Sequence, residues 1–222
     1  MVEIFEDRPA AGRQLAHRLA DLRLPERTLV LALPRGGVPV AFEIAQALDL
    51  PLDVFLVRKL GVPGQEELAM GALATGGVVA LNRDLVRILG VPQETLERVA
   101  LRELAELERR ERAFRQDRPP LERELSGRPL VLVDDGLATG STMLAAVEAV
   151  RRHGPSSVVV AVPVAPREVC ERLTPQVQDL VCLETPEDFD SVGSWYRDFH
   201  QVTDDEVRSL LSRARRPARA EA

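Results

Sequence analysis

The sequence predicts an α/β fold in which helices cover both faces of a mostly parallel sheet. Two observations support this prediction. Runs of apolar residues without polar alternation, such as 130–134 and 156–164, are typical of strands buried on both faces. Segments with helical spacing separate these runs, and right-handed crossovers then make the strands parallel. Every strand therefore ends at one edge of the sheet, where open α/β sheets bind their ligands.

The first part of the chain alternates helix and strand. Apolar spacing over residues 10–24 predicts an amphipathic helix whose Leu15, Leu19 and Leu22 face inward. Pro39 is tolerated only in the first turn of a helix, so a second helix is expected to begin at residue 38. The elements expected after the first helix are strand 28–34, helix 38–49 and strand 51–59.

A glycine-rich stretch at residues 60–77 interrupts this alternation. Its five glycines and Pro63 predict a long mobile loop or a loose hairpin. The short apolar run 78–82 predicts a strand. Residues 83–117 predict helix, because Glu and Arg recur there at i,i+3 and i,i+4. Because this helix is so polar, we expect it to lie on the surface or to pack against a partner.

The last part of the chain returns to strands and helices. The expected elements are strand 130–134, helix 141–152, strand 156–164, helix 166–173, strand 179–184 and a last helix in "DDEVRSLLSRA". We expect a single domain over residues 1–213. Within this domain, residues 83–117 are expected to be a helical insert and residues 186–213 a C-terminal hood and helix. Residues 214–222, which follow the domain, are expected to be a flexible tail.

Composition excludes several classes of protein. The 222 residues are 45% hydrophobic and 29% charged, which is ordinary for a globular protein. A net charge of −6 argues against a broad nucleic-acid surface. The sequence has no run of eighteen consecutive apolar residues, so no membrane span is predicted, and no signal peptide is recognisable. Cys170 and Cys182 lack metal or redox spacing, so we expect free thiols in the cytoplasm.

Two adjacent carboxylates, Asp134 and Asp135, end the strand at 130–134. Like charges near a partly dry strand end repel each other by roughly 1–4 kcal/mol. Paired acceptors suit a vicinal diol, helped by a divalent cation; the alternative is an exposed turn. The following "ATGST" lies at a helix start, which favours an anion, although a plain helix cap is the alternative. Diol acceptors beside an anion site predict a sugar phosphate.

The stretch "VLVDDGLATGST" at residues 131–142 resembles the signature of type I phosphoribosyltransferases. The resemblance implies their fold, with 5-phosphoribosyl 1-diphosphate (PRPP) as the donor and Mg²⁺ as the cofactor. It implies that Asp134 and Asp135 bind the ribose and the metal. It also implies that the donor's ribose and 5-phosphate are bound by the loop Gly136, Leu137, Ala138, Thr139, Gly140, Ser141 and Thr142.

Ala138 narrows the resemblance. Hypoxanthine-guanine enzymes of the family carry an aspartate at this position as a general base, and alanine cannot act as one. The loop instead resembles the adenine type, in which a mobile loop supplies the acid/base carboxylate. Glu66 and Glu67 are therefore the catalytic candidates; the alternative is that both are solvated loop residues.

Two further segments fit the donor's diphosphate. "LPRGG" at 33–37 resembles the family's pyrophosphate loop, and "RK" at 58–59 stands where the family places pyrophosphate-binding cations. Lys59 is the only lysine beside 28 arginines, and it is also a catalytic candidate. A structural turn and surface charges are the alternatives. The diphosphate candidates are Arg35, Gly36, Gly37, Arg58 and Lys59.

In the family that this sequence resembles, a variable segment called the hood recognises the acceptor substrate. Phe189, Trp195 and Tyr196 are candidates for stacking on a planar base, which is worth roughly 0.5–1.5 kcal/mol beyond area burial. The alternative is that these aromatics close the core or a dimer interface. The insert at 83–117 has no counterpart in the standard nucleobase-salvage enzymes, so the acceptor stays unassigned.

The resemblance implies a cytoplasmic enzyme that transfers phosphoribose from Mg-PRPP to a nitrogenous, nucleobase-like acceptor and releases pyrophosphate. Its expected partners are small molecules, without nucleic acid or membrane, and a homodimer is the candidate assembly. Two alternatives remain open: a regulator that binds PRPP without catalysis, and a different sugar-phosphate enzyme that uses the same loop.

Overall fold

The computed structural model describes residues 4–115 and 118–214 of the chain. Five strands pair in parallel to form the central sheet, in the order β2-β1-β6-β7-β8. The strands are β1 Leu29–Ala32, β2 Leu52–Val54, β6 Pro129–Val133, β7 Ser157–Val164 and β8 Asp179–Glu184. The predicted α/β fold with a mostly parallel sheet is confirmed.

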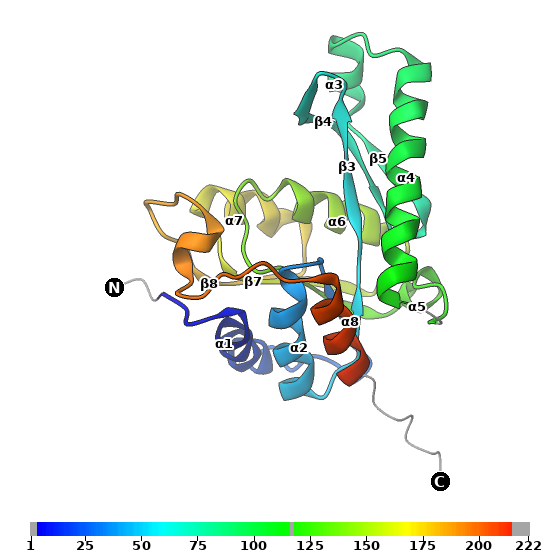
Figure 1. Cartoon of the computed structure of the whole chain (residues 1–222). Helices are drawn as coiled ribbons and strands as arrows, with labels where there is room; N and C mark the ends of the chain where they lie inside the picture. Colours follow the sequence, from blue (N-terminus) through cyan, green and yellow to red (C-terminus); the bar gives the residue numbers. More distant parts are fainter. Residues whose placement is uncertain (1–3, 116–117, 215–222) are drawn as a thin grey trace.

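Helices cover both faces of this sheet (Figure 1). One face carries α1 (Arg8–Ala20), α2 (Gly37–Leu48) and α8 (Asp204–Arg213). The opposite face carries α6 (Ser141–Arg151) and α7 (Arg167–Leu173). Three of these helices connect parallel strands, since α2 joins β1 to β2, α6 joins β6 to β7 and α7 joins β7 to β8.

The core has one apolar layer on each face of the sheet. Val30 of β1 belongs to the cluster that contains Leu15 of α1. The next residue of the strand, Leu31, belongs to the other cluster, together with Met143 of α6. Successive side chains of a strand point to opposite faces, so a strand covered on both faces has no polar alternation.

The first helix lies slightly earlier in the chain than predicted. It spans Arg8–Ala20 instead of 10–24, because the Asp7 carboxylate accepts a hydrogen bond from the Ala10 N–H at 2.7 Å and caps the helix. Of the three leucines expected to face inward, the two inside the helix are buried. Leu22 lies beyond the end of the helix and is 37% exposed, so its predicted inward position is wrong.

The single strand predicted at 51–59 is two strands in the structure. After the short β2, the chain enters β3 (Val57–Val62), which belongs to a second, three-stranded sheet. At the break, the Leu56 N–H donates to Thr75 Oγ1 at 3.0 Å instead of continuing the parallel ladder. The cationic pair at 58–59 therefore lies inside β3 and not at the carboxyl edge of the central sheet.

The glycine-rich stretch 60–77 forms an antiparallel hairpin and not a mobile loop. β3 pairs with β4 (Gln65–Ala74), which pairs in turn with β5 (Val78–Leu81). Gly64 has a φ of 81° in the connecting turn, a conformation that glycine adopts without strain. A Cβ atom at Gly71 would stand 2.5 Å from a backbone oxygen of β5. The hairpin alternative is confirmed, and the glycines serve the turn and the close strand pairing.

The predicted helical insert at 83–117 contains two helices, α3 (Arg83–Ile88) and α4 (Gln93–Arg115). Residues 116–117 lie outside the described part of the chain. α4 packs along β3 and β4 and against α8, so its partner lies in the same chain. Its last residue, Arg115, donates to both Asp53 carboxylate oxygens of β2, at 3.1 and 3.0 Å.

We call residues 57–115, which comprise β3, β4, β5, α3 and α4, the arm. Figure 1 shows that the hairpin of β3 and β4, α3 and the first half of α4 project beyond the central sheet. The base of the arm packs on α6 and on β2.

The remaining elements are short. They are the 3-10 helices Thr75–Gly77, Thr174–Gln176 and Val192–Trp195 and the helix α5, Glu122–Leu125. The tail predicted at 214–222 lies outside the described residues beyond Ala214. In the described ranges, we find no helix that is both long and apolar enough to cross a membrane.

Candidate functional site

The candidate site lies where the strand order of the central sheet reverses. β1 has β2 on one side and β6 on the other, so the turns that follow β1 and β6 meet at the carboxyl edge. The Leu33 N–H donates to the Val133 carbonyl at 2.8 Å and holds the two turns together. The peptide bond between Pro34 and Arg35 in the first turn is cis.

The glycine turn after β1 packs directly on the acidic turn after β6. A Cβ atom at Gly36 would overlap Asp135 Oδ2 and stand 2.5 Å from Asp135 Cγ. A Cβ atom at Gly37 would stand 2.6 Å from the Val133 carbonyl oxygen. A side chain at Gly37 would meet backbone, and one at Gly36 would displace the Asp135 carboxylate, so the "PRGG" turn and the acidic pair pack against each other.

The backbone and a distant arginine hold the acidic pair in place. The Asp135 N–H donates to Asp134 Oδ1 at 2.9 Å. Arg8 Nε donates to Asp135 Oδ2 at 2.7 Å, and the Tyr196 hydroxyl donates to the Asp135 carbonyl. Arg8 and Tyr196 lie 127 and 61 residues away from Asp135 along the chain, and no local pattern in the sequence pointed to their contacts.

Burial raises the pKa values of both carboxyl groups above their ordinary range. For Asp134, the negative charge of Asp135 raises the pKa further, to well above its usual value. For Asp135, the hydrogen bond and charge of Arg8 oppose the effect of burial. The pair therefore resists carrying two negative charges unless a cation or hydrogen-bond donors approach it.

The loop at 138–142 leads into the amino terminus of α6. Gly140 is the N-cap residue with a φ of 69°, and a Cβ atom there would overlap Val169 Cγ1 of α7. The Thr139 and Ser141 hydroxyls hydrogen-bond to each other at 2.9 Å. Arg172 Nη2 of α7 donates to the Thr139 carbonyl at 2.6 Å. α7 thus supports a loop whose backbone amides and hydroxyls suit an anion.

Two hollows border these turns. The first is about 370 Å³ and is lined by Arg8, Arg35, Gly36, Asp135, Phe199, His200, Gln201 and Val202. The second is about 320 Å³ and is lined by Val57, Arg58, Lys59, Gly61, Arg102, Glu103 and Thr142. Four of the five predicted diphosphate residues, all but Gly37, are therefore divided between the two hollows. The second hollow also reaches the predicted 5-phosphate loop through Thr142. A cavity of about 730 Å³ lies at the opposite edge of the sheet, beside the amino ends of β1 and β2.

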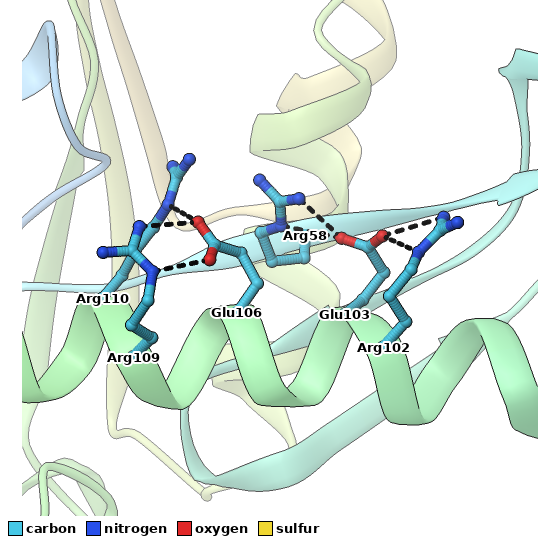
Figure 2. Close-up of polar contacts among 6 residues, drawn as sticks. All are labelled: Arg58, Arg102, Glu103, Glu106, Arg109 and Arg110. Carbon is cyan, nitrogen blue, oxygen red and sulfur yellow. Dashed lines mark hydrogen bonds and ion pairs between the residues drawn. The ribbon is translucent and has the colours of Figure 1, made fainter.

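Residues of the arm hold Arg58 in place (Figure 2). Arg58 Nε and Nη2 donate to Glu103 Oε2 at 2.9 and 2.6 Å, and Arg102 Nε donates to Glu103 Oε1 at 3.1 Å. Glu103 is only 7% exposed. Lys59, the neighbour of Arg58 in β3, is exposed, whereas Arg58 is partly buried. The polar insert therefore has a structural link to a predicted diphosphate residue.

Glu66 and Glu67 belong to β4, close to the turn of the hairpin. Their side chains lie outside the described part of the structure. Figure 1 shows that this end of the hairpin projects from the central sheet. An acid/base role for either residue stays a prediction.

The three aromatic candidates lie in a small cluster at the edge of the core. Tyr196 is 6% exposed and packs between Phe5 and Phe199, with ring centroids at 5.5 and 5.1 Å. Phe189 and Trp195 pack against the same cluster, which also contains Phe5. These contacts agree with the alternative that the aromatics close the core, and their stacking on an acceptor stays a prediction. Phe199, which is 38% exposed, lines the first hollow and was not predicted.

No cluster of three or more His, Cys, Asp or Glu side chains that could hold a metal is found among the described residues. Asp134 and Asp135 supply two carboxylates. Mg²⁺ is usually held by one or two carboxylates together with substrate phosphates and water. The donor set therefore fits a magnesium ion that arrives with a phosphorylated ligand.

Known proteins resemble this chain over most of its length. Residues 1–196 match a family model described as a phosphoribosyl transferase domain. Two proteins of Mycobacterium tuberculosis, "Putative phosphoribosyl transferase MT0597" of strain CDC 1551 and "Putative phosphoribosyl transferase Rv0571c" of strain H37Rv, are each 49% identical over 215 residues. The match covers 97% of this chain and 48% of each relative, so the chain spans about half the length of these relatives.

A solved structure is also similar. The crystal structure of TT1426 from Thermus thermophilus has 47% sequence identity and a TM-score of 0.83. The similarity covers 93% of this chain and 97% of that chain. It therefore extends over the central sheet and most of the chain.

Proposed function

Since the chain belongs to the phosphoribosyl transferase domain family, we propose that it transfers phosphoribose from Mg-PRPP to a nitrogenous, nucleobase-like acceptor and releases pyrophosphate. The observation that carries this proposal is the contact between the glycine turn at 33–37 and Asp135, beside the amino terminus of α6. A glycine backbone, a carboxylate pair and a helix terminus then lie together. They match the diphosphate, the ribose and the 5-phosphate of one donor.

The acidic pair is the proposed ribose site. Oxygen atoms of Asp134 and Asp135 accept hydrogen bonds from the vicinal hydroxyl groups of the ribose. The raised pKa values of the pair mean that a cation beside it stabilises its ionised form. Magnesium, when bound, supplies positive charge that neutralises the diphosphate leaving group. Both carboxylates are candidates to hold it.

The loop from Ala138 to Thr142 is the proposed 5-phosphate site. Its support is the position at the start of α6, where backbone N–H groups lack intrahelical partners and the helix dipole favours an anion. The hydrogen bond from Arg172 of α7 to the Thr139 carbonyl supports the backbone of this loop. Binding of the phosphate here orients the sugar so that its hydroxyl groups reach the acidic pair.

The diphosphate is proposed to lie against the glycine turn. Gly36 and Gly37 leave room for their backbone N–H groups to approach an anion. Arg35 lines the first hollow beside this turn and Arg58 and Lys59 line the second, and all three are proposed to supply positive charge to the diphosphate. As the bond between ribose C1 and the diphosphate oxygen breaks, negative charge develops on the leaving oxygen, and fixed cations stabilise that charge.

The acceptor nitrogen forms the new bond to C1 and loses a proton. Ala138 has no titratable group, and the resemblance of this loop to the adenine type implies that a mobile loop supplies the proton acceptor. Glu66 and Glu67 are the proposed candidates. Both lie in the arm, so this role requires the hairpin end to approach the site when substrates bind.

Pyrophosphate release tests the proposal. The purified protein is incubated with Mg-PRPP and a panel of purines, pyrimidines and other nitrogenous acceptors, and released pyrophosphate is measured. At least one acceptor is expected to give release that depends on Asp135, so the Asp135→Asn variant should be inactive. Arg13→Gln, an exposed change on α1, is the matched control and should keep full activity.

Two other outcomes have distinct meanings. If PRPP raises the melting temperature but no acceptor yields pyrophosphate, the protein is a PRPP-binding regulator and the transferase proposal is wrong. If neither PRPP nor ribose 5-phosphate binds, the sugar-phosphate site itself is wrong.

A further inference from the structure

Arg8 makes contacts that link the amino terminus of α1 with two distant parts of the site. Its side chain is 7% exposed. Nε donates to Asp135 Oδ2 at 2.7 Å, and Nη1 donates to the His200 carbonyl at 2.8 Å. The guanidinium carbon lies 3.8 Å from the centre of the Phe199 ring. One guanidinium therefore binds a carboxylate, a carbonyl and an aromatic face at once.

These contacts restrict the Asp135 carboxylate. Arg8 binds Oδ2 on one side, and the backbone of Gly36 lies so close that a Cβ atom there would overlap the same oxygen. The main chain of Asp135 is held by a separate contact, because its carbonyl oxygen accepts a hydrogen bond from the Tyr196 hydroxyl. Both the backbone and the side chain of this residue are thus fixed before a ligand binds. Such preorganisation lowers the cost of binding.

The same contacts join the acidic turn to the C-terminal segment 195–202. The Phe5 and Trp195 backbones hydrogen-bond at 2.9 Å, which fixes this segment beside the start of α1. Arg8 then reaches between Phe199 and Asp135 in the first hollow. A planar guanidinium suits this position because its fork binds a carboxylate edge while its face stacks on an aromatic ring, a geometry that the compact ammonium group of lysine does not reproduce.

We propose that Arg8 is a positioning residue for the donor sugar. It holds the Asp135 carboxylate in the orientation that accepts hydrogen bonds from the ribose hydroxyl groups, and it fixes the segment 195–202 to that carboxylate. Arg8 acts through Asp135 and need not touch the ligand. This inference rests on the proposed function, since it assigns Arg8 to the ribose site.

The test compares two sugar phosphates that differ in one hydroxyl group. Ribose 5-phosphate and 2-deoxyribose 5-phosphate are titrated into the unmodified protein and into Arg8→Gln by calorimetry. The unmodified protein should prefer ribose 5-phosphate. In Arg8→Gln, the affinity for ribose 5-phosphate should fall about tenfold, a factor typical of a lost charge-assisted hydrogen bond. The affinity for the deoxy sugar should change little, so the preference should largely disappear.

The ratio of the affinities for ribose 5-phosphate and 2-deoxyribose 5-phosphate distinguishes a positioning role of Arg8 from a purely structural one. If Arg8 only joins two segments, Arg8→Gln lowers the melting temperature and leaves the preference for ribose unchanged, which would overturn the inference. Arg8→Lys keeps the charge but lacks the planar fork, so its preference should also fall, by a smaller factor. If Arg8→Gln does not fold, Arg8→Lys provides the same comparison.

Arg13→Gln is the matched control. Arg13 lies on the same helix, its side chain is 56% exposed, and it pairs with Glu43 at 3.4 Å, so its loss should leave the preference unchanged. If the unmodified protein binds neither PRPP nor ribose 5-phosphate, the proposed function fails. If it binds ribose 5-phosphate and Arg8→Gln keeps the preference, only the inference about Arg8 fails.

Discussion

Gly36 lies so close to Asp135 that a Cβ atom added at Gly36 would stand 2.5 Å from Asp135 Cγ. The two residues follow different strands, β1 and β6, which are neighbours in the sheet. Their contact means that the glycine turn and the acidic turn cannot move independently. A change in one turn should therefore alter what the other turn binds.

Gly36→Ala should weaken binding at the acidic pair while the protein stays folded. The added methyl group must displace the Asp135 carboxylate, so the affinity for PRPP should fall at least tenfold, measured by calorimetry. Gly64→Ala is the matched control, because Gly64 lies in the hairpin turn with open space around its Cβ position. Its φ of 81° makes alanine strained there, so stability should fall by about 1 kcal/mol without loss of binding. Full PRPP affinity in Gly36→Ala would contradict the coupling.

Asp134→Asn should stabilise the ligand-free protein at neutral pH and weaken PRPP binding. The folded protein holds the Asp134 proton to a higher pH than the unfolded chain does, because burial and Asp135 raise its pKa. Stability therefore falls as the pH rises above the ordinary carboxyl value, and asparagine removes this loss. We therefore expect a gain in the free energy of unfolding near pH 7.

The pH dependence provides the check on Asp134→Asn. Chemical denaturation at pH 3.5, where both forms of residue 134 are neutral, should show little difference between variant and parent. An equal gain at both pH values would mean that the effect is not electrostatic. A loss of stability at pH 7 would show that the carboxylate is stabilising in the absence of ligand.

Glu103→Gln and Glu106→Gln should differ in their effect, although both residues pair with arginines on α4 (Figure 2). Glu103 is nearly buried and binds Arg58, so its loss should cost about 1–3 kcal/mol and leave Arg58 misplaced. The affinity for pyrophosphate should then fall. Glu106 is more exposed, and its pairs with Arg109 and Arg110 are screened by solvent, so the melting temperature should hardly change.

Glu106 also gives a titration control. Hydrogen bonds from Arg109 and Arg110 lower its pKa from 4.5 to about 2. Any stability from these pairs is present above pH 4.5 and is lost as the pH falls toward 2. NMR titration of the Glu106 carboxyl should show a pKa below 4.5, by an amount that solvent screening of the exposed pairs limits. Equal pyrophosphate affinities in the two variants would contradict the role of Glu103 in holding Arg58.

Cys170 should react with alkylating reagents before Cys182. A hydrogen bond from Cys182 lowers the pKa of the Cys170 thiol, helped by the positive charge of Arg167. The pKa of Cys182 is raised by Cys170 and by burial. Because the thiolate is the nucleophile, iodoacetamide at pH 8 followed by peptide mass spectrometry should find the label on Cys170. The Cys170→Ser variant should stay largely unlabelled while folded, and faster labelling of Cys182 in the parent protein would contradict this order.

Local patterns were sufficient for much of the fold. The apolar runs at 130–134 and 156–164 became β6 and β7, because a strand buried on both faces must be apolar on both faces. The acidic pair and the small turn after it were also recognisable, since they are contiguous in the chain. The glycine-rich stretch 60–77 was ambiguous, because glycine serves flexible loops, tight turns and close strand pairing alike.

The sequence by itself determined the α/β fold and the turns that follow β1 and β6, because these depend on hydrophobic period and turn chemistry over a few residues. The end that it predicted for the strand at 51–59 was wrong. Only the tertiary structure decided which turns meet and what holds them. Arg8 and Asp135 are 127 residues apart, and their hydrogen bond follows from the position of α1 beside the sheet. The same is true of Arg58 and Glu103, 45 residues apart. Such contacts depend on the packing of whole elements, and no local spacing records that packing.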